Sequence, residues 1–114
     1  MISEDAITDI LGQYRKFGWE LERVILSPAL RSVLTTPSDV LFEGCEVAES
    51  EIDAAWFSRL NANGRTAWEL RSLTAAPFAL VESTGPDPTL EELSELFQRV
   101  EDQMRERVIR PRGN

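Results

Sequence analysis

Histidine is absent from the sequence, and cysteine occurs once, at Cys45. Histidine is the side chain that most often transfers protons near neutral pH, and it is the commonest zinc ligand. Its absence excludes Ser-His-Asp catalysis, Cys-His catalysis and the HExxH zinc site. A single cysteine excludes an intramolecular disulfide, a CxxC redox pair and a zinc ribbon. We therefore expect no catalytic thiol, no metal centre and no other cofactor.

The sequence also lacks an apolar run close to the ~18 residues that a membrane span requires. Its first residues, Met1 to Asp5, include acids where a secretory signal carries bases. Bases are few throughout, because 12 Lys and Arg stand against 20 Asp and Glu, which gives a formal net charge of −8. Nucleic-acid binding relies on Lys and Arg that displace counterions from phosphate. We expect a cytoplasmic protein that binds neither membranes nor nucleic acid.

What the sequence does contain is enough apolar material for one packed core. Hydrophobic residues make up 42% of the 114 positions, and charged residues make up 28%. Both fractions are typical of a globular domain, and single cores commonly reach about 100–150 residues. The chain is therefore predicted to form one domain over residues 1–114.

Two segments have the pattern of capped amphipathic helices. Ser3 is a favourable N-cap for the first, and Gly18 is a favourable stop. Thr89 and Glu92 have the spacing of a capping box at the start of the second. Apolar residues at helical spacing follow each cap. They are Ile7, Ile10, Leu11 and Tyr14 in the first helix, and Leu93, Leu96, Phe97, Val100 and Met104 in the second.

Between these helices, the apolar pattern changes to the period of a strand. Residues 19–26 alternate and then become continuously apolar, which predicts a first strand. Ser27 and Pro28 are a cap followed by an N1 proline, so a short helix is expected over residues 29–34.

Residues 35–53 contain six acids and no base. We expect short strands at 40–42 and 45–47, on either side of a bend at Gly44. The acids lack the spacing of an EF-hand loop, so calcium binding is not predicted. Such charge runs are usually solvated faces, and the other interpretation is an acidic docking patch for a basic partner.

Residues 55–72 have the clearest strand signal, a β-hairpin with Asn63 and Gly64 at its turn. Asn-Gly is the preferred pair for a two-residue type I′ turn, in which both residues have positive φ. A further turn over 73–77 and a strand over 78–81 follow.

The hairpin register decides which side chains share a face. A two- or four-residue loop places Phe57 with Trp68 and Leu70 on the core face. The other face then carries five residues, which are the predicted partner-binding set: Trp56, Leu60, Arg65, Glu69 and Arg71.

Trp and Arg are enriched among interface hot spots, and two helices are sufficient to cover one face of the sheet. We therefore predict that this face binds a protein partner or a second copy in a symmetric homodimer. Two alternatives remain open at this stage: a helix covers Trp56, or a bulge exchanges the faces.

Other chemistry has weaker support. Cys45 lies between Glu43 and Glu46, and negative charge raises a thiol pKa, so a structural side chain is expected. Glu20 and Glu22 alternate with apolar residues, as on a solvated strand face. The arginines at positions 105, 107, 110 and 112 suit a helix C-terminus.

Taken together, the pattern predicts a two-layer α+β domain with an antiparallel sheet of four or five strands, packed by the N-terminal and C-terminal helices. The predicted function is a non-enzymatic protein-interaction module: a small acidic adaptor, or a chaperone-like or immunity-like protein. The alternative is a small-molecule-binding domain or weak enzyme that uses carboxylates and Arg in a cleft between sheet and helices. That alternative requires a pocket of several hundred Å³ with convergent polar groups.

Overall fold

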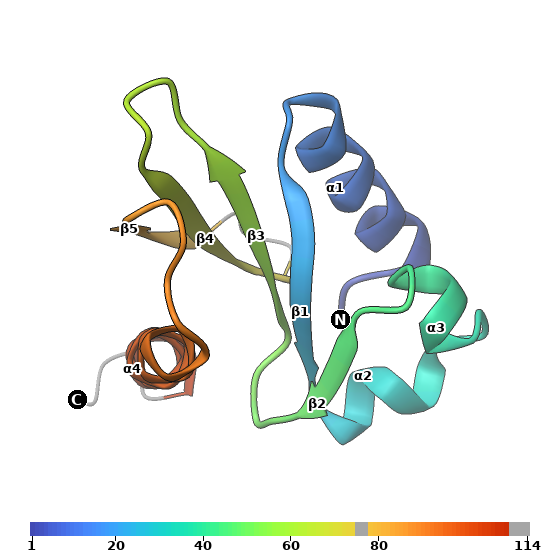
Figure 1. Cartoon of the computed structure of the whole chain (residues 1–114). Helices are drawn as coiled ribbons and strands as arrows, with labels where there is room; N and C mark the ends of the chain where they lie inside the picture. The colour runs from blue at the N-terminus through green and yellow to red at the C-terminus, as the bar shows by residue number, and fades with distance from the viewer. Residues whose placement is uncertain (75–77, 110–114) are drawn as a thin grey trace.

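A computed structural model describes residues 1–74 and 78–109 of the chain (Figure 1). The elements are α1 (Glu4–Lys16), β1 (Glu20–Leu26), α2 (Pro28–Val33), α3 (Ser38–Leu41), β2 (Glu46–Glu49), β3 (Ala54–Leu60), β4 (Thr66–Ser72), β5 (Ala79–Thr84) and α4 (Leu90–Ile109). The strands form one five-stranded sheet in the order β2-β1-β3-β4-β5. This confirms the predicted α+β fold, in which the N-terminal and C-terminal helices pack against a sheet.

The sheet is mostly antiparallel, with one parallel pair at its β2 edge. β3, β4 and β5 form an antiparallel meander, and β1 pairs antiparallel with β3. β2 runs parallel to β1, since α2 and α3 carry the chain from one to the other. A parallel pair needs such a crossover, whereas a tight hairpin is enough for an antiparallel pair.

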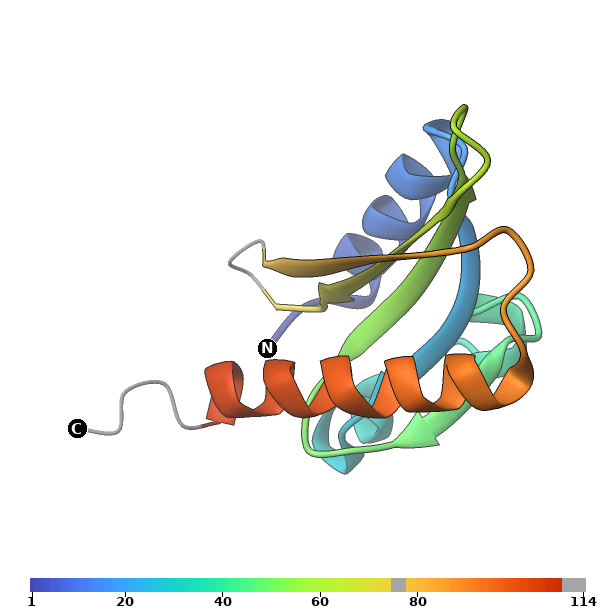
Figure 2. The same cartoon turned by 60° about the vertical axis from the view of Figure 1, so that its left-hand side comes forward.

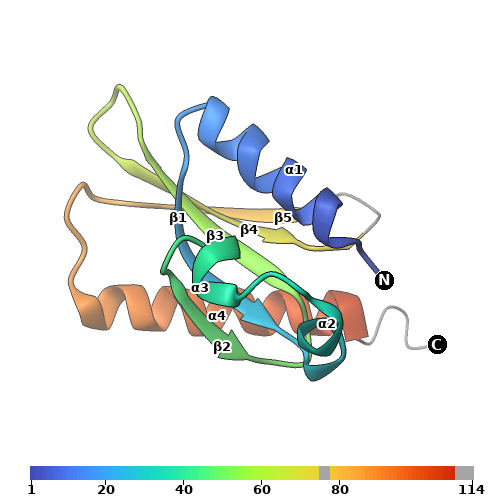
Figure 3. The same ribbon diagram turned by 90° about the vertical axis from the view of Figure 1, so that its right-hand side faces the viewer.

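Helices lie against both faces of the sheet, with α1, α2 and α3 on one side and α4 on the other (Figures 1 and 3). We name the two sides the α1 face and the α4 face. Each face forms a two-layer, helix-on-sheet core of its own. The core on the α1 face includes Ile7, Leu11, Val24, Leu26, Leu30, Phe42, Ala55 and Phe57. The core on the α4 face includes Ile25, Ala54, Trp56, Trp68, Leu70, Leu96, Val100 and Met104.

The caps of the two long helices agree with the sequence prediction. The Ser3 side chain accepts a hydrogen bond from the Ala6 N–H, and α1 ends before Gly18 at φ +88°. At the start of α4, the Thr89 hydroxyl accepts from the Glu92 N–H at 3.1 Å. The Glu92 carboxylate accepts from the Thr89 N–H at 2.8 Å. These reciprocal bonds are the predicted capping box.

The predicted strand at 40–42 is wrong, because residues 38–41 form the short helix α3. The backbone N–H groups of Val40 and Leu41 both donate to the Pro37 carbonyl. The helix ends where Glu43 and Gly44 adopt φ values of 56° and 79°. A left-handed pair of this kind reverses the chain, so the strand that follows, β2, begins only at Glu46.

The hairpin of β3 and β4 forms as predicted, but its turn is not type I′. Leu60 pairs with Thr66, and the Asn61 N–H donates to the Arg65 carbonyl at 2.8 Å. The loop therefore has three residues, 62–64, and of these only Gly64 has positive φ, at +84°. This is the hairpin in which a type I turn is followed by a left-handed glycine.

Replacing Gly64 with valine is expected to lower the free energy of unfolding by about 1–2 kcal/mol. A Cβ at this position would meet no atom within 4 Å, so the cost is the left-handed backbone alone. Urea denaturation of Gly64→Val and Gly64→Asn provides the measurement, because asparagine tolerates this conformation. Equal midpoints for the two variants would contradict this explanation.

Two further expectations concern the rest of the chain. The turn predicted at 73–77 lies partly outside the described residues, while β5 begins at Ala79 and runs to Thr84, beyond the predicted end at 81.

In the portion that the structure describes, no helix combines the length and the apolar character that spanning a bilayer requires.

Candidate functional site

A β-bulge in β1 directs Arg23 toward α4. Leu21 pairs with Phe57, but Arg23 pairs with Trp56, so Glu22 is an extra residue in the ladder. Bulges re-aim the side chains that follow them. As a result, Leu21 lies on the α1 face while Arg23 lies on the α4 face.

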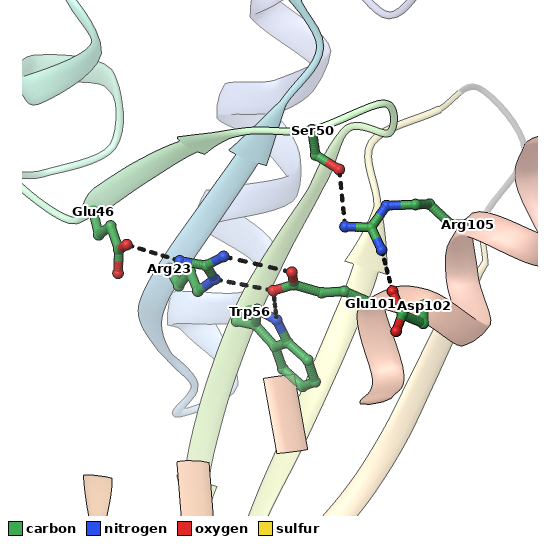
Figure 4. Close-up of polar contacts among 7 residues, drawn as sticks. All are labelled: Arg23, Glu46, Ser50, Trp56, Glu101, Asp102 and Arg105. Carbon is green, nitrogen blue, oxygen red and sulfur yellow. Dashed lines mark hydrogen bonds and ion pairs between the residues drawn. The ribbon is translucent and has the colours of Figure 1, made fainter. Parts of the chain in front are cut away.

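Arg23 forms a charged network with Glu101 of α4 (Figure 4). The Glu101 carboxylate accepts from Arg23 Nε at 2.9 Å and from Trp56 Nε1 at 2.8 Å. Arg23 Nη1 also donates to the exposed carboxylate of Glu46 at 2.8 Å. Glu101 is only 4% exposed, so its charge is paired inside the core. The network joins α4 to β1, β2 and β3.

The surroundings keep Arg23 charged. Burial alone would lower the pKa of its guanidinium. The hydrogen bonds and charges of Glu101 and Glu46 outweigh burial and raise the pKa above its ordinary value. Arg23 is therefore a permanent cation that anchors α4 to the sheet.

A groove of about 530 Å³ lies along this network, between α4 and the β2 edge; we call it the α4–β2 groove. Arg105 lies at one end, where it pairs with Asp102 and donates to Ser50 Oγ at 3.3 Å (Figure 4). The charged groups of the α4–β2 groove are Arg23, Glu46, Glu101, Asp102 and Arg105. Each is paired with another member of the groove, so they offer a ligand few open donors or acceptors.

The residues of the predicted partner-binding set do not share one exposed face of the sheet. Trp56 has an exposed fraction of 0% and packs against Phe97 of α4, with 4.9 Å between ring centroids. It shares its face with Trp68 and Leu70, which were predicted to lie opposite. The predicted face assignment is therefore wrong, because a three-residue loop shifts the parity of the pairing by one.

The other members of the predicted set separate between the two faces. Leu60 follows Trp56 on the α4 face and is 66% exposed at the end of β3. Glu69 and Arg71 pair with Phe57 and Ala55, so both lie on the α1 face.

Two of the polar residues on the α1 face have specific partners. The Tyr14 hydroxyl donates to Glu69, and its ring stacks on Phe57 with 3.9 Å between centroids. Burial and the Glu69 carboxylate raise the pKa of Tyr14 well above its ordinary value. Arg65 Nε donates to Ser83 Oγ of β5 at 2.9 Å. The polar part of the predicted set thus borders β5 rather than Trp56.

β5 is an edge strand with free backbone groups. The Ser72 N–H donates to the Phe78 carbonyl, so these two residues form a hydrogen-bonded pair. Along an antiparallel ladder, such pairs alternate with pairs whose N–H and C=O groups point away from the neighbouring strand. The N–H and C=O groups of Ala79, Val81 and Ser83 therefore point away from β4. No strand within residues 1–74 or 78–109 pairs with this side of β5.

The two edges of the sheet differ in how they are protected. β2 has four residues with a glutamate at each end. Short strands and edge charges are devices that prevent unwanted pairing. β5 has six residues with no Pro, Lys or Arg, and Val81 at its centre is 59% exposed. β5 is therefore the open edge.

A second groove, of about 500 Å³, lies between the end of β5 and α4; we call it the β5–α4 groove. The chain leaves β5, passes through residues 85–88 and returns as α4 (Figure 2). The groove is lined by residues 83–88 together with Glu92, Glu95, Leu96 and Arg99. Arg99 pairs with Glu82 at 3.3 Å, which leaves three carboxylates facing the groove, those of Asp87, Glu92 and Glu95.

The Cys45 side chain is half-buried and lies against β1. Its thiol donates to the Leu21 carbonyl at 3.2 Å. Burial raises its pKa, and the charge of Glu22 raises it further. The charge that raises the pKa of this thiol is thus that of Glu22, and not that of the flanking acids Glu43 and Glu46. Within the described part of the chain, no group of three or more Cys, Asp or Glu side chains is placed to hold a metal ion.

The sequence interpretation missed Glu101 and the open edge of β5. Glu101 follows Phe97 by four residues and precedes Met104 by three, so it lies within the apolar stripe of α4. An acid inside such a stripe is a signal for a buried, paired carboxylate.

No protein-family model matches the chain, and neither a curated protein nor a solved structure matches it.

Proposed function

We propose that this chain is a non-enzymatic protein-interaction domain that binds its partner at the open edge of β5. Its main support is the row of backbone groups at Ala79, Val81 and Ser83, which point away from β4. Unpaired strand edges are templates for another strand, and several peptide-binding domains use them in this way.

The surroundings of β5 suit such a role. Val81 offers an exposed apolar side chain on the α1 face, next to Glu69. Arg65 reaches β5 through Ser83, so three members of the originally predicted set, Arg65, Glu69 and Arg71, border the edge. Trp56 contributes to the fold and not to this surface.

Replacing Val81 with proline is expected to abolish partner binding while the domain stays folded. Proline removes one outward N–H donor, and a solvent-facing position on an edge strand tolerates it. The measurement is affinity capture from cells that naturally express the chain, with wild type and Val81→Pro compared by mass spectrometry. Circular dichroism and the urea midpoint provide the folding control.

One stoichiometric protein that the wild type retains and Val81→Pro loses would support the proposed function. Asp39→Asn is a matched surface control, because Asp39 is exposed in α3, away from β5. A partner retained equally by all three proteins would contradict binding at this edge.

The second candidate is a small-molecule-binding domain, and the α4–β2 groove is the feature that favours it. The groove has the volume of a ligand pocket and contains the expected Arg and carboxylate side chains. Its charged groups already neutralise one another, which is why protein interaction is better supported. A thermal-shift screen with metabolite mixtures tests it, and Arg105→Ala should remove any shift that arises there.

A further inference from the structure

We infer that the partner of β5 is an extended, basic segment of another protein, which adds as a sixth strand and inserts a Lys or Arg side chain into the β5–α4 groove. This inference rests on the proposed protein-interaction function and specifies its partner. It combines two features that lie side by side: an open strand edge and an acidic groove at the end of that strand.

The backbone geometry requires an extended partner. Ala79, Val81 and Ser83 each present one N–H and one C=O outward. Only another strand has donors and acceptors at the matching spacing. Side chains of an added strand alternate between the two faces of the sheet. Those on the α1 face would contact Val81, and those on the α4 face would lie toward the groove.

The charges of the groove favour a basic partner. Glu92 caps α4, and acids in a first helical turn are commonly explained by the helix dipole. Glu95 lies in the second turn and Asp87 lies in the preceding loop, so neither has this explanation. Neither side chain has a hydrogen bond or ion pair with any residue that the structure describes. A cationic side chain would compensate both, and the net charge of −8 favours its approach.

A second copy of this chain is a poorer occupant of the same edge. β5 carries no Lys or Arg, and its one charged residue is Glu82. In a symmetric β5 pair, neither copy would therefore bring a cation of this strand to the acidic groove of the other. The geometry thus favours a basic partner over the homodimer.

Selection of a random octapeptide display library on the full chain tests the inference. Enriched peptides should alternate β-branched residues with Lys or Arg, and their affinity should fall with increasing salt. For the best synthetic peptide, Val81→Pro should weaken binding about tenfold or more. The double variant Asp87→Asn with Glu95→Gln should weaken it about threefold. Asp39→Asn should leave the affinity unchanged.

The outcomes separate the inference from the function on which it rests. Enriched peptides without Lys or Arg, or peptides that bind away from β5, would overturn the inference while leaving an interaction function in place. Absence of any enriched peptide would count against both. A dimer detected by light scattering and lost in Val81→Pro would show that a second copy occupies the edge. If Val81→Pro fails to fold, Val81→Lys replaces it, because an edge lysine blocks strand addition and repels a cationic peptide.

Discussion

Replacing Glu101 with alanine is expected to lower the free energy of unfolding by about 3–5 kcal/mol. The substitution leaves the Arg23 guanidinium and the Trp56 indole N–H without their buried acceptor. A buried charge that loses its partner destabilises the fold by more than the ion pair stabilises it, because the charge cannot recover its hydration. A domain of this size is typically stable by about 5–15 kcal/mol, so the variant should fold but unfold at much lower urea.

Asp102→Ala is the matched control for Glu101→Ala. Asp102 is the next residue of α4 and also pairs with an arginine, but its side chain is 60% exposed. Exposed ion pairs contribute about 0.2–1 kcal/mol. Urea denaturation followed by circular dichroism should separate the two variants clearly, and a similar loss in both would show that the core does not depend on the Glu101 charge.

A double-mutant cycle isolates the interaction itself. Arg23→Met removes the cation, and Glu101→Gln keeps an acceptor for the Trp56 indole. The double variant should be more stable than the sum of the single losses predicts, by roughly 1–3 kcal/mol. Additive losses would mean that Arg23 and Glu101 do not interact in solution.

The sequence was sufficient to predict both long helices, since local features specify them. The Ser3 cap, the Thr89 and Glu92 capping box and the apolar stripes all act within a few residues of the chain. The position of the hairpin was equally local, because Asn63 and Gly64 lie in the loop that reverses the chain. Each of these features predicts the same local structure in any tertiary fold.

The hairpin faces were not predictable from the turn residues. An Asn-Gly pair is compatible with a two-residue loop and with a three-residue loop that ends in a left-handed glycine. The two loops differ by one residue, and one residue exchanges the faces of the whole hairpin. The continuous apolar run of Ala54, Ala55, Trp56 and Phe57 was the more reliable signal, because a strand covered on both faces does not alternate.

The candidate site was harder to predict than the fold because its parts lie far apart in the sequence. Arg23 and Glu101 are 78 positions apart, and a bulge at Glu22 decides whether they meet. The open edge of β5 likewise depends on the strand order, which local patterns do not specify. Only Arg65, Glu69 and Arg71 of the predicted set lie near that edge, because they belong to or directly precede β4, the strand that pairs with β5.

Replacing Trp56 with alanine is expected to cost about 3–5 kcal/mol, since it opens a large cavity beneath α4. Trp56 is fully buried, packs on Phe97 and donates its N–H to Glu101. Trp56→Phe keeps most of the apolar contact but leaves the carboxylate with one donor fewer, so its cost should be about 1–2 kcal/mol. Urea denaturation of both variants provides the measurement.

Trp19→Ala is the matched control, because Trp19 is half-buried on the α1 face and lies beneath Arg59, with 4.6 Å from the guanidinium to the ring. It should cost clearly less than Trp56→Ala. Light scattering on the same proteins distinguishes core from interface. If Trp56 formed a dimer contact, Trp56→Ala would release a stable folded monomer, whereas a core position predicts loss of stability at constant mass. A stable monomer produced from a wild-type dimer would refute the burial of Trp56 beneath α4.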